Sequence, residues 1–305
     1  MKIKLFIAIA IAALSSVVGF AQQDLMLSHE IISRINKNPA GTGNSEDIDI
    51  FLHGRMQWIG VDNAPKSGLL NVTDYIESIN SGIGLSLAYD KFGVGHSNTD
   101  AKLVYSYHID VNDNFIVAFG VSGGVYVSYF NPYDNTVEDE QKYFQASFMN
   151  EKETKVNPDF NVGVELSQRA WTLGASITHL INNEAESLTP GRHFYAYITS
   201  LLPLNQLWAI GPTASYMHRH QTDVLEIGSM AFYNRLLWGG ITWRPDLNNR
   251  LDPSVLAFTL GCEWKKFRVG YSYDLGLGSK NQLPPNTHEL TLSVGIEKGK
   301  KNNGF

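Results

Sequence analysis

One serine lies in a pattern that hydrolases use to present a nucleophile. Gly120-Val121-Ser122-Gly123-Gly124 matches Gly-x-Ser-x-Gly, in which the serine occupies a sharp turn between a strand and a helix. Here Val125-Tyr126-Val127 continues as an extended segment, and no amphipathic helix follows it. We therefore expect Ser122 to pack inside the fold, and we predict no serine-hydrolase chemistry.

Other residues that could bind a metal or a nucleotide fit those roles poorly. His218 and His220 are two residues apart, so on a strand they share a face, and His193 could approach them; we interpret them as loop histidines. The single cysteine, Cys262, alternates with large apolar residues and should face the same side as they do. Gly276-Leu277-Gly278-Ser279-Lys280 lacks the spacing of a phosphate-binding loop. We predict no metal site, no cofactor and no enzymatic activity.

Arg55 and Gln57 are two residues apart and therefore lie on the same face of an extended segment. If that face is buried, the Arg55 guanidinium needs a carboxylate partner. Asp90, Asp159 and Asp274 have the matching facing in other alternating segments. Two interpretations stay open: an interior salt-bridge network that stiffens the fold, or a docking surface for the N-terminal segment or a substrate.

Alternation of large apolar and small residues is the main structural signal in the chain. It is clear in residues 83–90, 171–178, 268–274 and 289–296. Because neighbouring side chains of a strand point to opposite faces, each segment has one large apolar face and one face of small or polar residues. A soluble sandwich would instead expose long polar side chains. The pattern predicts an all-β, transmembrane antiparallel outer-membrane β-barrel with its large residues toward lipid. Aromatic girdles would comprise Trp58, Tyr89, Tyr107, Trp171, Trp208, Trp243, Trp264 and Tyr273.

We expect about 14 strands of about ten residues each. They should lie near 49–59, 66–76, 81–90, 99–109, 114–128, 158–168, 170–179, 191–201, 206–217, 221–230, 233–243, 253–263, 265–274 and 287–297. Short connections such as 77–80 alternate with longer ones such as 91–98 and 129–157, as periplasmic turns alternate with external loops. This parity predicts both mature termini in the periplasm and the acidic loop 129–157 outside.

The N-terminus predicts export from the cytoplasm. Residues 1–21 combine a basic start, an apolar run and small residues before the cleavage point, which is typical of a signal peptide cleaved after Ala21. We assign 22–48 to a segment in the periplasm or the barrel mouth, 49–297 to the barrel and 298–305 to a tail. A net charge of −6 and a pI near 5.8 disfavour nucleic-acid binding.

Two motifs near the N-terminus resemble those of a known family. Asn38-Pro39-Ala40-Gly41 resembles the Asn-Pro-Ala-x-Ala-Gly motif of the PorP/SprF family of type IX secretion system membrane proteins. Arg55-x-Gln57-Trp58-x-Gly60, followed by Ala64-Pro65, is similar to the Arg-x-Gln-Trp-x-Gly-x-x-x-Ala-Pro-x-Thr signature of that family. The resemblance covers nearly the whole mature chain. The motif residues that would contact a partner or brace the barrel are Asn38, Pro39, Ala40, Arg55, Gln57, Trp58, Gly60 and Pro65.

The resemblance implies an accessory outer-membrane barrel of the type IX machinery. Such proteins assist export or surface attachment of proteins with C-terminal sorting domains, including gliding adhesins. The implied partners are the machinery on the periplasmic side, the secreted client protein and outer-membrane lipid, with no nucleic acid. A passive channel or transporter for a small solute is the alternative.

Overall fold

A computed structural model describes most of the chain. The described residues are 27–28, 33–45, 47–93, 95–131, 152–181, 188–219, 222–247, 252–277 and 286–298. The expected signal peptide, 1–21, and most of the acidic loop, 129–157, lie outside them. Within the described residues, no helix has the length and apolar character needed to cross a membrane.

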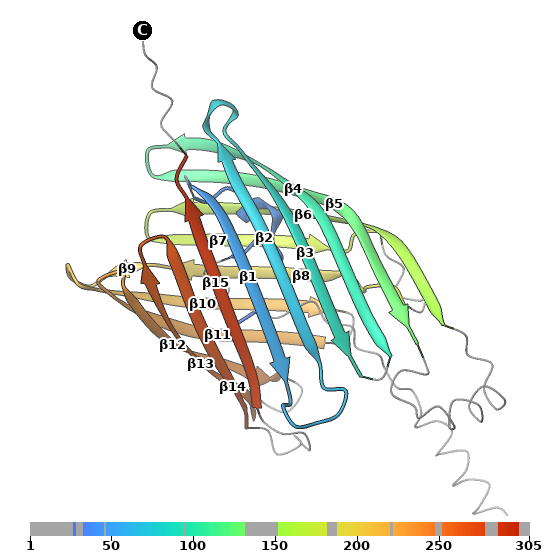
Figure 1. Ribbon diagram of the computed structural model, residues 1–305. Helices are drawn as coiled ribbons and strands as arrows, with labels where there is room; N and C mark the ends of the chain where they lie inside the picture. Colours follow the sequence, from blue (N-terminus) through green and yellow to red (C-terminus); the bar gives the residue numbers. More distant parts are fainter. Residues whose placement is uncertain are drawn as a thin grey trace, which may run out of the picture.

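The described chain forms a closed antiparallel β-barrel (Figure 1). Its 14 long strands confirm the expected strand number. They are β1 (Ile48–Gln57), β2 (Lys66–Ile76), β3 (Ser81–Phe92), β4 (His96–Asn112), β5 (Phe115–Phe130), β6 (Glu153–Gln168), β7 (Trp171–Thr178), β8 (His193–Ser200), β10 (Trp208–Arg219), β11 (Thr222–Tyr233), β12 (Leu237–Asp246), β13 (Asp252–Trp264), β14 (Phe267–Gly276) and β15 (Asn286–Ile296). A further two-residue strand, β9 (Leu202–Pro203), pairs with the start of β10.

Closure joins the first long strand to the last. In the register of β1 and β15, Ile48 lies opposite Ile296 and Gln57 opposite Thr287. Each long strand therefore has a partner on both sides. A closed ring satisfies the backbone hydrogen-bonding groups that lipid cannot, and it removes the open edges on which sheets aggregate.

The two faces of the barrel wall differ as the alternation predicted. Leu103 and Leu260 are 70% and 67% exposed on the outer face, whereas Ser106 and Ser272 are fully buried on the inner face. The outer face thus carries large apolar side chains, and the inner face carries small and polar ones. This is the arrangement of a barrel whose outer surface meets lipid.

Connections of different length lie at the two ends of the barrel. Tight turns at 113–114, 169–170 and 265–266 define what we name the short-turn mouth. The opposite end is the long-loop mouth, where the longer connections 131–152 and 179–192 begin and end. The prediction of a long loop at 91–98 is wrong, because β3 and β4 continue pairing up to Phe92 and His96. Gly93 and Gly95 then close a tight turn with positive φ angles.

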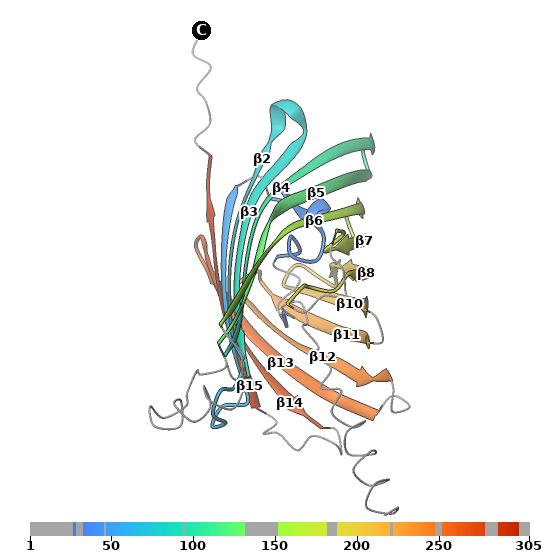
Figure 2. The same ribbon diagram turned by 90° about the vertical axis from the view of Figure 1, so that its right-hand side faces the viewer.

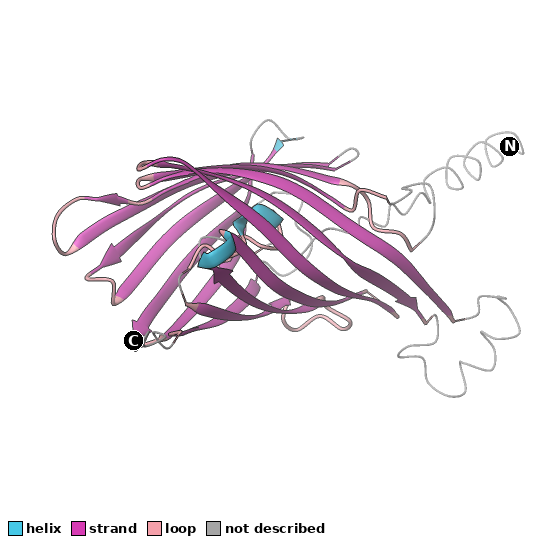
Figure 3. Ribbon diagram, turned by 90° about the horizontal axis from the view of Figure 1, so that it is seen from above, coloured by secondary structure: helices cyan, strands magenta, loops and turns pink. Residues whose placement is uncertain are grey.

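The N-terminal segment enters the barrel before β1. It contains the 3-10 helix η1 (Pro39–Gly41), which packs against β4, β5 and β6. Figures 2 and 3 show this part of the chain inside the ring of strands. A second 3-10 helix, η2 (Glu77–Ile79), forms the turn between β2 and β3. We name residues 33–45 the lumen plug.

Candidate functional site: the plugged lumen

Asn38 anchors the lumen plug to the barrel wall. Its Oδ1 accepts a hydrogen bond from the Ala40 backbone N–H at 2.9 Å, which caps η1. Its Nδ2 donates to the carbonyl of Val164 at 3.0 Å and to the hydroxyl of Tyr197 at 3.1 Å. Asn38 and Ala40 are fully buried. The Asn-Pro-Ala motif therefore builds the tight turn of the plug and fixes it to β6 and β8.

Glycines in the wall allow the plug to lie directly on the sheet. A Cβ at Gly120 would come within 2.0 Å of the Ala40 backbone nitrogen, and one at Gly163 within 2.0 Å of Asn38 Oδ1. A Cβ at Gly82 would come within 2.3 Å of the Thr42 carbonyl oxygen. Any larger residue at these positions would push the plug away from the wall. The alternation predicted small interior residues here but not the reason for them.

Two basic residues of the plug pair with acidic residues of the wall. Arg34 Nε lies 2.9 Å from Glu165 Oε1, and the Glu165 side chain is only 1% exposed. Tyr197 also donates a hydrogen bond to Glu165. Further round the wall, on β11, Lys37 Nζ lies 3.5 Å from Glu226 Oε2. The plug therefore neutralises carboxylates on two separate parts of the barrel wall.

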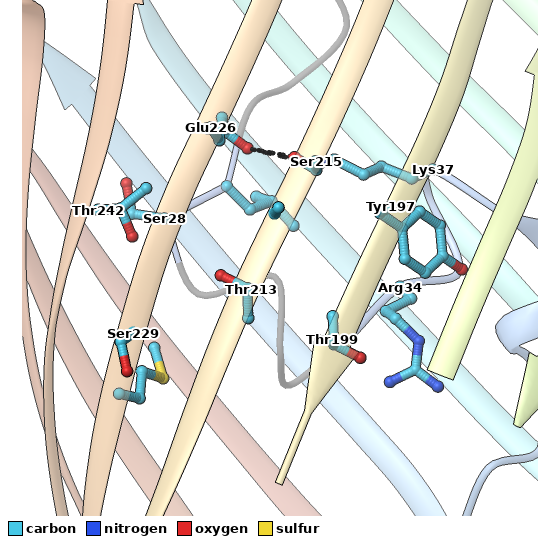
Figure 4. A pocket seen from close by; sticks show the side chains of 13 residues that line it. Ser28, Arg34, Lys37, Tyr197, Thr199, Thr213, Ser215, Glu226, Ser229 and Thr242 are labelled. Atoms are coloured by element: carbon cyan, nitrogen blue, oxygen red, sulfur yellow. Dashed lines mark hydrogen bonds and ion pairs between the residues drawn. The ribbon is translucent and has the colours of Figure 1, made fainter. Parts of the chain in front are cut away.

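Small cavities lie beside the plug. One of about 50 Å³ is bounded by plug residues and by β8, β10, β11 and β12. Figure 4 shows it from close by: Glu226 and Ser215 are hydrogen-bonded to each other, and Tyr197 lies beside them on the neighbouring strand β8, with Arg34 of the plug near it. Another, of about 60 Å³, lies between the plug and β3–β8. Each has room for little more than water.

A buried ion network occupies the half of the lumen nearer the long-loop mouth. Arg55 contacts Glu289 and lies 3.2 Å from Asp274. Arg244 lies 2.8 Å from the same Asp274 carboxylate and also contacts Glu226. His53 Nε2 lies 3.3 Å from Glu289. We name these six residues the lumen ion network.

The N-terminal segment also joins this network. The Ser28 backbone N–H donates to Glu289 Oε2 at 2.8 Å, and its hydroxyl donates to Asp274 Oδ1 at 3.0 Å. Arg244 in turn donates to the Ser28 hydroxyl at 2.9 Å. Cations and carboxylates buried in this way need both charge pairing and hydrogen bonds. The network thus ties β1, β11, β12, β14 and β15 to one another and to the segment before the plug.

Of the three carboxylates expected as ion-pair partners of Arg55, one contacts it and two have other partners. Asp274 contacts Arg55 as the sequence suggested, whereas Asp159 pairs with Lys102 at 2.8 Å and with His179 at 2.7 Å. Asp90 accepts a hydrogen bond from Ser67. Glu289 was missed as a partner, although its alternation with Thr291 and Ser293 in β15 gives the inward facing.

The rest of the Arg-x-Gln-Trp motif shapes the first connection at the long-loop mouth. Gln57 ends β1, and its backbone N–H donates to the Pro65 carbonyl at 3.0 Å. Trp58 has a φ of 50°, so its backbone is not extended and it does not belong to the strand. The prediction that Trp58 continues the strand as a girdle residue is therefore wrong. Gly60 has a φ of 99°, a conformation that favours glycine. These three residues and Pro65 set the turn after β1.

The remaining sequence candidates are not brought together. Ser122 lies within β5 and is 5% exposed, so no strand-to-helix turn presents it. His193 is buried in the lumen, whereas His218 pairs with Asp223 at 2.7 Å and is 42% exposed. Cys262 is exposed on the outer face, as expected. His220 lies outside the described residues, and among those described no group of three or more His, Cys, Asp or Glu could hold a metal ion.

A larger space than the two small cavities beside the plug lies at the short-turn mouth. It is a cavity of about 880 Å³ lined by the ends of β6–β8 and β10–β14, and we name it the vestibule. Arg34 of the lumen plug lies in its lining. The vestibule is therefore an open recess that reaches inward to the plug.

Solved structures of outer-membrane proteins have the same fold. Omp33 of Acinetobacter baumannii has a TM-score of 0.51 and 11% identity, covering 84% of this chain and 100% of that chain. A mutant of the monoaromatic hydrocarbon channel TodX has a TM-score of 0.53 and 10% identity, covering 90% and 95%. The toluene transporter TbuX of Ralstonia pickettii has a TM-score of 0.53 and 9% identity, covering 85% and 92%. At these identities the likeness establishes the barrel fold alone.

Sequence comparison identifies the family. No curated protein sequence matches the chain significantly. The sequence model of the type IX secretion system membrane protein PorP/SprF matches residues 19–294, which covers all the barrel strands except the end of β15. The match and the fold together establish that the protein resides in the outer membrane. The chain belongs to the PorP/SprF family of type IX secretion system membrane proteins.

Proposed function

We propose that this barrel is a non-enzymatic accessory component of the type IX secretion system. It assists the export or surface attachment of proteins with C-terminal sorting domains, such as gliding adhesins. Its partners are the secretion machinery on the periplasmic side and the secreted client. The observation that carries this proposal is that a barrel of this family has its lumen occupied by its own N-terminal segment.

The occupied lumen favours an accessory role over that of a passive pore. The lumen plug is held by hydrogen bonds from Asn38 and by the Arg34–Glu165 ion pair. The plug backbone at Gly82 and Gly120, and the Asn38 side chain at Gly163, leave no space between the plug and the wall there. A solute channel would require this segment to leave or rearrange. An accessory protein can act through its mouths and loops while its lumen stays closed.

The experiment is a deletion of the gene followed by measurement of client proteins on the cell surface and in the medium. We expect clients with C-terminal sorting domains to accumulate inside the envelope. Complementation with the full chain should restore their export. Normal client export in the deletion strain would refute the proposal.

Reconstitution tests the channel alternative directly. The purified barrel in liposomes should take up small solutes, including monoaromatic hydrocarbons, no faster than liposomes alone. A porin in the same liposomes supplies the positive control. Rapid, saturable uptake by the intact barrel would favour the channel instead.

A further inference from the structure

The vestibule has an unusual charge for this protein. Its lining includes four arginines, Arg34, Arg169, Arg235 and Arg268, and one carboxylate, Glu263. The whole chain carries a net charge of −6. A cavity wall with an excess of cations concentrates field lines and attracts anions. The vestibule is therefore a cationic recess in an acidic protein.

Two of these arginines are available to a ligand. Arg34 is paired with Glu165, and Arg268 lies 3.3 Å from Glu263. Arg169 and Arg235 are exposed in the turns after β6 and β11, and neither has an ion-pair partner among the described residues. Arginine side chains bind carboxylates through paired, planar hydrogen bonds. Within the described part of the chain, these two guanidinium groups at the rim of the recess have no ion-pair partner.

The rim of the short-turn mouth is electrically polarised. The turns beside the vestibule carry Arg169, Arg235 and Lys265, together with Lys266, which pairs with Glu297 at 3.3 Å. Glu77 and Asp113 lie in the turns of β2–β3 and β4–β5 across the mouth. An acidic partner would be attracted to the β6–β14 side and repelled from the β2–β5 side. Such an arrangement sets the position of a bound chain as well as its affinity.

The inner wall of the vestibule adds an aromatic surface. Phe232 and Trp238 line it, and Trp238 is only 8% exposed. The indole lies against Gly261, where a Cβ would come within 2.2 Å of the ring. The buried Nε1 of Trp238 has no hydrogen-bond partner among the described residues. Buried donors without acceptors are rare in folded proteins and call for an explanation.

We propose that the vestibule binds an extended, acidic polypeptide segment of a periplasmic partner. The short-turn mouth of an outer-membrane barrel faces the periplasm. The volume of about 880 Å³ suits a short stretch of chain rather than a folded domain. Arg34, Arg268 and Trp238 line the recess from within the barrel, where the headgroups of the surrounding bilayer do not reach. The inference deepens the proposed function and rests on it for the existence of a protein partner.

The binding test uses a fluorescein-labelled hexaglutamate peptide and the purified full-length barrel in zwitterionic micelles. Fluorescence anisotropy should show saturable binding that weakens as salt is raised. The variant Arg169→Gln with Arg235→Gln should bind about tenfold more weakly. The control variant, Lys66→Gln with Lys152→Gln, removes two exposed charges at the long-loop mouth and should bind within about twofold of the wild type.

Three results would overturn the inference. These are unchanged affinity in the double arginine variant, equal binding of hexaglutamine, and displacement of the peptide by phosphatidylglycerol at a few molecules per barrel. The last result would assign the recess to an anionic lipid. Loss of affinity confined to the arginine variant and to the acidic peptide supports the acidic segment.

Client export in cells separates this inference from the proposed function. The double arginine variant should reach normal abundance in the outer membrane and export less client. If the deletion strain fails to export and the arginine variant exports normally, the inference is refuted and the proposed function stands. If the deletion strain itself exports normally, the proposed function is refuted whatever the peptide binds.

Discussion

Replacing Arg55 with alanine would measure how strongly the lumen ion network stabilises the barrel. Arg55 contacts Glu289, whose side chain is fully buried, and lies 3.2 Å from Asp274. Removing one partner of a buried ion pair costs about 3–5 kcal/mol. Here Glu289 keeps the Ser28 N–H at 2.8 Å, and Asp274 keeps Arg244 at 2.8 Å. Because these contacts offset part of the loss, we expect Arg55→Ala to lower the unfolding free energy by about 2 kcal/mol.

The assay is urea unfolding of the barrel in lipid vesicles, followed by tryptophan fluorescence. The substitution Glu289→Gln should lower the unfolding free energy less in the Arg55→Ala variant than in the wild type. We expect this difference, the coupling energy, to be about 1 kcal/mol or more. Lys66→Ala serves as the control, because Lys66 is exposed at the same mouth, and it should change stability by less than about 0.5 kcal/mol. An Arg55→Ala loss no larger than that of Lys66→Ala, or strictly additive losses, would refute the reasoning.

Three further changes test the plug, the facing of the wall and the motif. Gly163→Val would overlap Asn38 and should displace the plug, giving more frequent channel openings in planar bilayers; Gly54→Val, with open space around it, should not. Leu85→Arg should reduce heat-modifiable folding more than Ser86→Arg, since arginine on the lipid face near the midplane costs about 2–4 kcal/mol and only Leu85 faces outward. Gln57→Ala should leave barrel abundance normal and lower client export; normal export would remove the contact role of Gln57.

The barrel was predictable from the sequence because its signal is local. Period-two alternation assigns each side chain to a face without knowledge of the partner strand, and strands such as β2 have the expected limits. The error at 91–98 has a local cause. Polar side chains there resemble a loop, yet their backbones continue the ladder until Gly93 and Gly95 permit the turn.

The site was predictable only in part, because its contacts join distant parts of the chain. The inward facing of Arg55 follows from alternation, which offered Asp274 as one of three candidate partners without selecting it. Its contact with Glu289 depends on the register of β1 and β15, which places Arg55 opposite Glu289. Nothing near Asn38 indicates that it will meet Gly163, because that contact depends on the path of the plug through the closed ring.

The plug and the wall depend on each other for charge as well as for shape. Arg34 of the plug forms an ion pair with Glu165 of the wall, whose side chain is almost fully buried. If the plug left the lumen, Glu165 would lose this partner, and an unpaired carboxylate in a confined interior is costly. The wall would also expose the bare backbone at Gly120 and Gly163, which the plug now covers. Anything that replaced the plug would therefore need to bring a cation to Glu165 and a small-residue surface to the glycines, and a neutral solute offers neither. This requirement favours a barrel that acts at its mouths over one that conducts through its lumen.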